Sequence, residues 1–205
     1  MMTNYKSILS FLIISLVLFS CKNESEKEKT TEKESNTETL SEEALLDTVQ
    51  RQTLKYFWDY AEPNSGMARE RYHPDGEYPK NDAHVVTTGG SGFGLMAIVS
   101  GMERKWIQRD SAVARLDKIA DFLDNAPRFH GVWPHWLNGE TGDVQAFSEK
   151  DNGGDLVETS FLAQGFIVVR EYLKNGNEEE QAVAAKYDEL WKGIEWEWYT
   201  NNKNG

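Results

Sequence analysis

The chain has 205 residues, a formal net charge of −12, and a composition that is 39% hydrophobic and 12% aromatic, with seven Trp. This composition is typical of a globular protein that can bury one sizeable core. The acidity and the lack of a basic cluster in the sequence argue against a nucleic-acid-binding protein, which would need a basic face.

The first twenty residues predict a secretion signal. Lys6 precedes an apolar run from Ile8 to Phe19, which is shorter than a typical membrane-spanning helix. The run ends in "LFSC", which resembles a bacterial lipobox and makes Cys21 the predicted site of lipidation. The alternative is an uncut signal anchor with Cys21 as a passive small residue. Cys21 is the only cysteine in the sequence, so a disulfide within the chain and a cysteine-based metal site are both excluded.

Residues 22–40 predict a solvated tether, because they include one apolar residue and no aromatic one. Behind a lipidated Cys21, such a tether would hold the following domain at some distance from a membrane. The multiple chains of a bacterial lipoprotein hold a protein well. We therefore expect a lipid-anchored protein of the bacterial cell envelope, either in the periplasm or on the outer-membrane surface.

The folded domain is expected to begin near residue 41 with a helix. Ser41 is suited to cap it, and the acids at positions 42 and 43 favour its first turn. Residues at three- and four-residue steps form one face of this helix: Leu46, Val49, Thr53, Phe57 and Tyr60. A long loop over residues 64–86 follows. Long ordered loops are often functional, and Arg71 in this one is a candidate substrate-binding residue.

Further helices are expected over residues 92–104, 110–125, 155–174 and 178–200. A β-hairpin is predicted between the second and third of these, because Asn-Gly and Thr-Gly pairs separate two short alternating runs. The fold class is therefore all-α with a small β-hairpin insertion. The odd number of amphipathic helices indicates that the chain is a piece of a larger fold.

The segment "KDNGGDLVETSFLAQG", residues 150–165, contains the strongest candidates for chemistry. If Asp155 opens the helix, Glu158 lies on the same face, and the Gly-Gly pair lets Asp151 point to the same place. Clustered acids repel, so one of them should hold its proton to higher pH, which suits glycoside hydrolysis. One alternative is a plain capped helix with acids in its first turn. A calcium site is the other, although the alternating oxygen ligands of a calcium loop are missing.

The predicted hairpin, "GVWPHWLNGETGD", combines aromatic rings with planar polar groups, as sugar sites do. Its candidate substrate-binding residues are Trp133, His135, Trp136 and Asn138. The alternative is that the two Trp fill the core. No His has a partner at zinc spacing, and residues 87–94 lack the Lys-Ser/Thr ending of a phosphate loop. We therefore predict neither a metal nor another cofactor.

Three segments resemble the glucoamylase-like proteins, and specifically glycoside hydrolase family 144, the bacterial endo-β-1,2-glucanases. They are "GGSGFGLMAIVSGMERKWI", "VWPHWLNGETGDV" and "DNGGDLVETSFLAQG", of which the third is the most specific. The resemblance runs from about Leu45 to the last residue. It implies that residues 41–205 are the N-terminal part of an (α/α)6 barrel, which follows the signal peptide at residues 1–20 and the tether at 21–40 predicted above.

The resemblance also implies a function, namely inverting hydrolysis of a β-glucan without a metal. The implicated acids of the family correspond to Asp155 and Glu158, with Asp151 just upstream. A further acid of the family lies beyond Gly205, so the 205-residue chain is expected to be inactive by itself. The alternatives are a non-catalytic glucan-binding surface lipoprotein and a glucoamylase-like domain linked to cyclic β-glucan metabolism.

Overall fold

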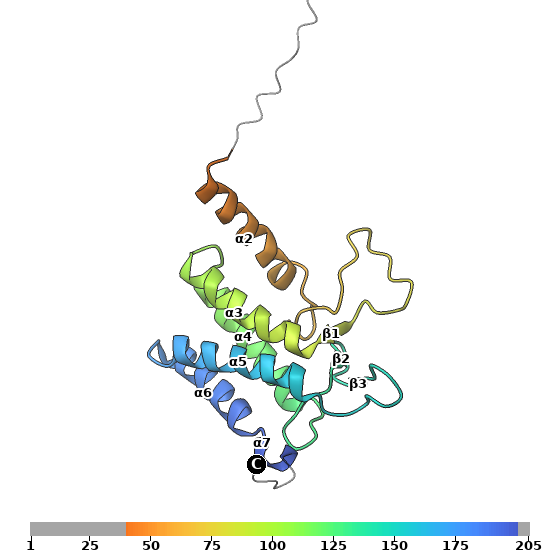
Figure 1. Ribbon diagram of the computed structural model, residues 1–205. Helices are drawn as coiled ribbons and strands as arrows, with labels where there is room; N and C mark the ends of the chain where they lie inside the picture. The colour runs from red at the N-terminus through yellow and green to blue at the C-terminus, as the bar shows by residue number, and fades with distance from the viewer. Residues whose placement is uncertain (1–39, 201–205) are drawn as a thin grey trace, which may run out of the picture. The chain divides into compact units, whose positions relative to one another are not determined.

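The computed structural model describes residues 40–200 (Figure 1). The predicted signal segment, Cys21 and nearly all of the predicted tether lie outside these residues. The elements, in chain order, are α2 (Glu42–Trp58), β1 (Val85–Thr87), α3 (Thr88–Glu103), α4 (Arg109–Asn125), β2 (Trp136–Asn138), β3 (Val144–Gln145), α5 (Leu156–Leu173), α6 (Glu178–Lys192) and α7 (Trp196–Tyr199). The described chain is thus mostly helical with one small sheet, which confirms the all-α class. None of these helices is long and apolar enough to cross a membrane.

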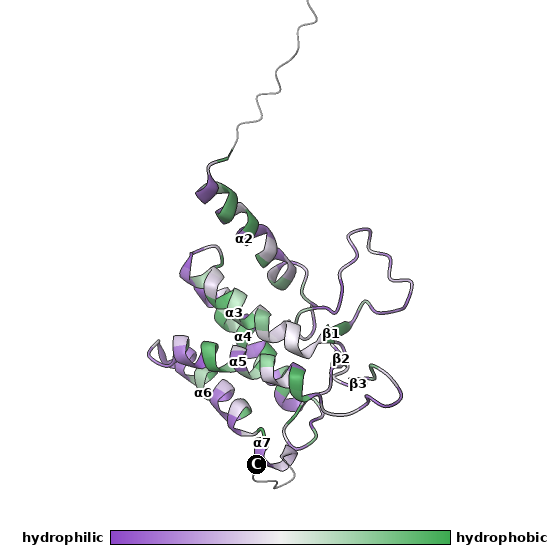
Figure 2. Ribbon diagram, in the orientation of Figure 1, coloured by the Kyte–Doolittle hydropathy of each residue, from purple (hydrophilic) through white to green (hydrophobic). Residues whose placement is uncertain are grey.

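Helix α5 lies between α3 and α6 and forms the centre of the packing, while α4 packs against α6 and α2 against α3. Figure 2 shows why α3 and α5 take the inner places, since both are apolar along most of their length. Helix α6 is more polar and begins with a capping box between Asn177 and Glu180, which satisfies two backbone N–H groups at once. The core therefore lies where α3, α4, α5 and α6 meet.

Helices α3 and α5 approach so closely that both need glycine at the contact. A Cβ atom on Gly92 would lie 2.2 Å from the carbonyl oxygen of Phe161, and one on Gly165 would lie 2.6 Å from that of Gly92. Real Cβ atoms do not come this near to a backbone oxygen, because protein interiors are close-packed. The two glycines therefore set the distance between the helices.

The sheet is antiparallel in the order β1-β2-β3, with Val86 opposite Leu137 and Leu137 opposite Val144. Strands β2 and β3 form the predicted hairpin. The side-chain oxygen of Asn138 accepts hydrogen bonds from the backbone N–H groups of Glu140 and Thr141 and so holds the turn. Gly142, at φ +81°, completes it. Strand β1 was not predicted, because three residues are too few for a periodic signal. The sheet joins the long loop to the hairpin.

Two helix boundaries differ from the predictions. Helix α3 begins four residues earlier than expected, and the predicted helix over residues 178–200 ends at Lys192 before a short α7. The face that periodicity gives to α2 is largely exposed among the described residues. Leu46 and Val49 are 54% and 52% exposed, whereas Leu54 is the buried residue of this helix.

Candidate functional site

The N-termini of α3 and α5 meet at a long-range hydrogen bond. The carboxylate of Glu158, in the first turn of α5, accepts a hydrogen bond of 3.0 Å from the backbone N–H of Gly89 in the first turn of α3. A Cβ atom on Gly89 would lie 2.4 Å from the same carboxylate oxygen, so glycine is needed there. Glu158 thus lies on the positive end of the α3 dipole, a position that suits a negative charge.

Asp155 caps α5 and binds a histidine at the same time. Its Oδ1 accepts hydrogen bonds from the backbone N–H groups of Val157 and Glu158 at 2.9 and 3.0 Å, and its Oδ2 lies 2.8 Å from Nδ1 of His135. The backbone N–H of Asp155 donates to the carbonyl of Trp133 at 2.8 Å. The start of α5 is therefore fastened to the chain that leads into β2.

His135 is also held from the α3 side. Thr88 donates its backbone N–H to the carbonyl of His135 and its hydroxyl to the carbonyl of Pro134, at 3.2 and 2.5 Å. The imidazole packs edge-on against Trp136 and at a tilt against Phe147, with ring centroids 5.4 and 4.5 Å apart. Two helix N-termini and two aromatic rings thus fix the place of this side chain.

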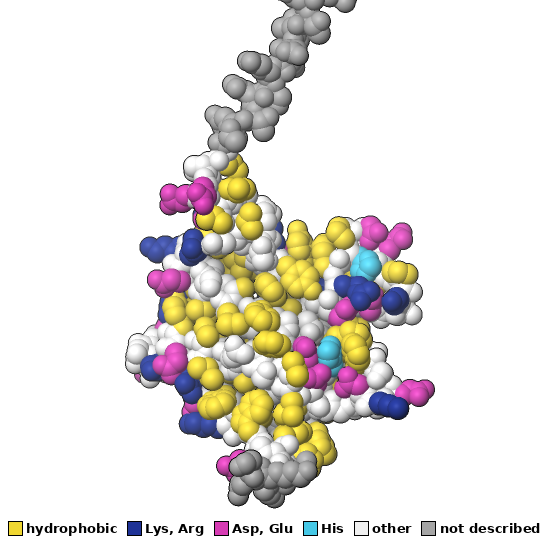
Figure 3. Space-filling model, in the orientation of Figure 1, with side chains coloured by type: hydrophobic (Ala, Val, Ile, Leu, Met, Phe, Trp, Pro, Cys, Tyr) yellow, Lys and Arg dark blue, Asp and Glu magenta, His cyan; other side chains and the backbone are white. Residues whose placement is uncertain are grey.

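Asp151 completes the cluster. One ligand atom from each of His135, Asp151 and Asp155 can be chosen so that all three lie within 4.8 Å of one another. Asp151 and Asp155 thus do converge, at a place where Figure 3 shows histidine and acidic side chains gathered beside the hairpin and α5. Even with both aspartates bidentate, the three side chains offer fewer ligand atoms than the six to eight oxygens of a calcium site, and we assign no metal here.

The pKa of Asp155 is lowered from its ordinary value. Burial acts to raise this pKa, but hydrogen bonds from the backbone N–H of Glu158, the His135 ring and the backbone N–H of Val157 outweigh it. Asp155 is therefore not the acid that was predicted to hold its proton to higher pH. Its carboxylate is ionised at neutral pH.

Asp155 is expected to make the fold less stable in acid. Because its pKa is lower in the folded than in the unfolded chain, its ionised form stabilises the fold above the unfolded pKa of about 3.9. That contribution is lost as the pH falls below about 4 through the folded pKa. Asn caps a helix as well as Asp does. Urea unfolding of Asp155→Asn between pH 2 and 7 should therefore show a shallower acid slope, and a slope equal to that of the parent chain would contradict the assignment.

The other predicted substrate-binding residues do not all reach this cluster. Trp133 is completely buried, donates its indole N–H to the carbonyl of Leu123 at 3.0 Å and packs on Phe166. Its predicted contact with a sugar is wrong, because the ring lies in the core. Arg71 pairs with Glu70 on the long loop. No contact described for residues 40–200 joins it to Asp151 or Asp155.

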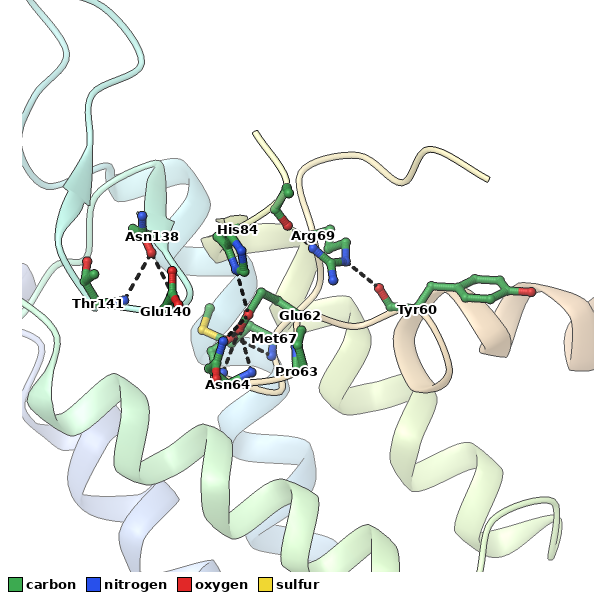
Figure 4. Close-up of polar contacts among 12 residues, drawn as sticks. Tyr60, Glu62, Pro63, Asn64, Met67, Arg69, His84, Asn138, Glu140 and Thr141 are labelled. Carbon is green, nitrogen blue, oxygen red and sulfur yellow. Dashed lines mark hydrogen bonds and ion pairs between the residues drawn. The ribbon is translucent and has the colours of Figure 1, made fainter. Parts of the chain in front are cut away.

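Trp136 lies beside the cluster, whereas the contacts described for the Asn138 side chain lie in the hairpin turn. Trp136 is half-buried and packs with Phe147 and His135. The Asn138 side chain is committed to the hairpin turn, as Figure 4 shows. Phe147, which is 50% exposed, was missed because an isolated Phe in a polar segment carries no sequence signal.

A buried carboxylate outside the cluster organises the long loop (Figure 4). Glu62 is completely buried and accepts hydrogen bonds from both backbone and side chain of Asn64 and Ser65, at 2.7 to 3.0 Å. Its other neighbour is Nδ1 of His84, at 3.2 Å. A Cβ atom on Gly139 would lie 2.6 Å from its carboxylate. Glu62 therefore holds the loop, the approach to β1 and the hairpin turn together, and we call this set the Glu62 clasp.

No family model matches the chain. A curated relative, the exo-β-1,2-glucooligosaccharide sophorohydrolase (non-reducing end) of Parabacteroides distasonis, is 47% identical over 166 residues. These residues are 80% of this chain and 22% of that protein.

Two solved structures share the fold. The endo-β-1,2-glucanase of Chitinophaga pinensis, in complex with sophorotriose and glucose, is 60% identical with a TM-score of 0.79, over 81% of this chain and 40% of that one. The β-1,2-glucanase of Parabacteroides distasonis is 46% identical with a TM-score of 0.73, over 81% of this chain and 23% of that one. The chain thus spans less than half the length of each of these relatives. By sequence and fold it is a homologue of one part of the β-1,2-glucan hydrolases, which confirms the family resemblance carried by its three motifs.

Proposed function

We propose that this chain supplies one wall of the active site of a β-1,2-glucan hydrolase. The observation that carries the proposal is the meeting of Asp151, Asp155 and His135 at the junction of two helix N-termini, beside two aromatic rings. The relative that is 60% identical over this part of the chain is an endo-β-1,2-glucanase with sophorotriose bound. These similarities favour a hydrolase over a non-catalytic glucan-binding lipoprotein and over a glucoamylase-like domain linked to cyclic β-glucan metabolism.

The proposed reaction is hydrolysis with inversion, by an acid and a base. An inverting enzyme needs a carboxylic acid that protonates the leaving oxygen and a carboxylate that activates water from the opposite face of the ring. The lowered pKa of Asp155 makes it unsuitable as the proton donor. Asp151 and Glu158 are then the two acids of this chain proposed to contact the sugar or the attacking water.

Two further features belong to the same proposal. The helices that pack around α5 are proposed to be part of an (α/α)6 barrel, which the mostly helical fold supports. The protein is proposed to be held at the bacterial cell envelope by a lipid on Cys21, which the "LFSC" segment supports. Labelling with a fatty-acid probe that persists in Cys21→Ala would refute the lipid anchor.

The test of the function uses the protein at the length at which its host produces it. We expect it to release sophorooligosaccharides or sophorose from β-1,2-glucan and to leave β-1,3- and β-1,4-glucans intact. Asp151→Asn keeps the shape of the side chain and should lower turnover by about 10²- to 10⁴-fold, the usual size of a general acid–base contribution. A parent protein inactive on β-1,2-glucan, or full turnover in the variant, would refute the proposal.

Phe147 is expected to form an aromatic platform for a glucose ring. It is half-exposed and packs on both His135 and Trp136, and its backbone N–H donates to the carbonyl of Asp151 at 3.1 Å, so the residue lies next to the acidic cluster. Aromatic contacts contribute about 0.5–1.5 kcal/mol, so Phe147→Ala should raise KM for sophorooligosaccharides about three- to tenfold and change kcat less.

Phe129→Ala is the matched control for this prediction. Phe129 is 52% exposed, close to the value for Phe147, but it packs on His130 and Trp198 instead. We expect this variant to keep the KM of the parent. Equal KM values for the Phe147 variant and the parent would show that the platform is not used.

A further inference from the structure

Both carboxylate oxygens of Asp155 are already engaged by the protein. Oδ1 accepts two backbone N–H groups in the first turn of α5, and Oδ2 accepts one hydrogen bond from His135. The side chain is 17% exposed. A carboxylate that takes a proton from water must have an oxygen free to accept it. Three hydrogen bonds from the protein already occupy most of the accepting positions of Asp155. Its geometry is that of a group that holds another side chain in place.

The side chain that it holds is His135, and the hydrogen bond defines which ring nitrogen carries the proton. An ionised carboxylate only accepts hydrogen bonds, so Nδ1 of His135 must be the donor. In the neutral imidazole, Nε2 is then an acceptor. Among the hydrogen bonds described for residues 40–200, none involves this Nε2. The side chain of His135 is 23% exposed, so the ring is not sealed in the core.

The ring has little freedom to turn away. Thr88 holds the backbone of His135, and the rings of Trp136 and Phe147 pack on its imidazole. The same logic governs the aspartate of a Ser-His-Asp triad, which fixes the tautomer and orientation of its histidine without taking the proton itself. In this chain the ordered imidazole lies beside Asp151.

We propose that Asp155 is a positioning residue, which holds His135 as the Nδ1–H tautomer and so presents Nε2 as a hydrogen-bond acceptor to a hydroxyl group of the bound glucan. The substrate part of this inference rests on the proposed function, whereas the tautomer does not. Asp155 thereby acts on the sugar through His135, and Asp151 and Glu158 are left as the acids that face the reaction directly.

The tautomer can be tested without any substrate. Asp155→Ser keeps a good helix cap but is too short to reach the imidazole, so the fold should persist. ¹⁵N NMR of the imidazoles of the full chain, which has four His, should show neutral His135 as the Nδ1–H form in the parent. In Asp155→Ser the Nε2–H form should predominate. An unchanged tautomer, or the Nε2–H form in the parent, would overturn the proposal.

His130 supplies the matched control for the NMR test. Its Nδ1 lies 2.9 Å from a carboxylate oxygen of Glu195, so it has the same kind of partner at another place. Glu195→Gln should change the signals of His130 and leave those of His135 as they are. A change at His135 in this variant would mean that the readout does not report on Asp155.

Kinetics of the protein at the length its host produces separates positioning from direct chemistry. We expect Asp155→Ser and His135→Ala each to lower kcat/KM on β-1,2-glucan by at least about tenfold. The double variant should be no worse than His135→Ala within about threefold, because Asp155 has nothing to act through once the imidazole is gone. Losses that multiply would show that Asp155 acts directly and would overturn the inference. An inactive parent would refute the proposed function instead, and the NMR result would still decide the tautomer.

Discussion

Glu62→Ala is expected to lower the free energy of unfolding by about 3–5 kcal/mol, because two buried donors, the backbone N–H and the hydroxyl of Ser65, each lose their acceptor at a cost of about 1–3 kcal/mol. The Glu62 clasp explains the size of the effect. The other donors that lose this acceptor, those of Asn64 and the ring of His84, are themselves partly exposed to water and add less. For a domain of this size the thermal midpoint should fall by roughly 10 °C, as measured by calorimetry or circular dichroism.

Two variants make the Glu62 prediction sharper. Glu62→Gln keeps the shape and one oxygen, so we expect a smaller loss, of about 1–3 kcal/mol for the unsatisfied donors. Glu171→Ala removes a carboxylate with two partners, Arg170 and Lys174, on the open surface, where such pairs contribute little. If Glu62→Ala and Glu171→Ala unfold at the same midpoint, the clasp does not stabilise the fold.

The elements that the sequence predicts well are those with local signals at both ends. Helix α5 begins just after Asp155 and ends at Leu173, as expected, because a capping acid precedes its apolar run and an Asn-Gly pair follows it. The hairpin was predicted because its turn chemistry also lies within a few residues of sequence. These features depend on neighbouring residues alone, so a single sequence contains the information for them.

The elements that were missed depend on contacts between distant parts of the chain. Periodicity predicts which residues of α2 share a face, but not which element packs against it. Leu46 on that face is exposed in the described residues. Nothing near Trp133 in the sequence tells that its ring enters the core while Trp136 stays half-buried. The Glu62 clasp joins Glu62 to Gly139, and no local pattern reports such a pair.

The candidate site follows the same division. The Gly-Gly pair before α5 was enough to predict that Asp151 and Asp155 converge, since glycine lets the backbone bend. The lowered pKa of Asp155 has a local cause and a distant one. Burial raises this pKa, and the largest opposing effect is the hydrogen bond from the backbone N–H of Glu158, which the helix start predicts, whereas the hydrogen bond from His135, twenty residues away, could not be predicted. The bond between Glu158 and Gly89 spans 69 residues, and it required the α3–α5 contact to be known.

Gly92→Ala is expected to destabilise the fold by at least about 3 kcal/mol, at the upper end of the cost of overpacking. The new methyl group would lie 2.2 Å from the carbonyl oxygen of Phe161, and a backbone carbonyl inside a helix cannot rotate away as a side chain can. Helices α3 and α5 would have to move apart at the place where they are closest. Because Gly89 and Glu158 join the same two helices one turn away, the candidate site should open with them.

Gly153→Ala, just before α5, provides the matched control. A Cβ atom on Gly153 would meet nothing within 4 Å, and its backbone is not in the left-handed region. The substitution should be neutral, or stabilising by about 0.4–1 kcal/mol through the lower entropy of the unfolded chain. Urea unfolding of both variants therefore separates a steric effect from a general effect of replacing glycine. If Gly92→Ala and Gly153→Ala unfolded at the same urea midpoint, the contact between α3 and α5 would be able to accommodate a methyl group. The close approach of the two helices would then not be what holds Gly89 against Glu158.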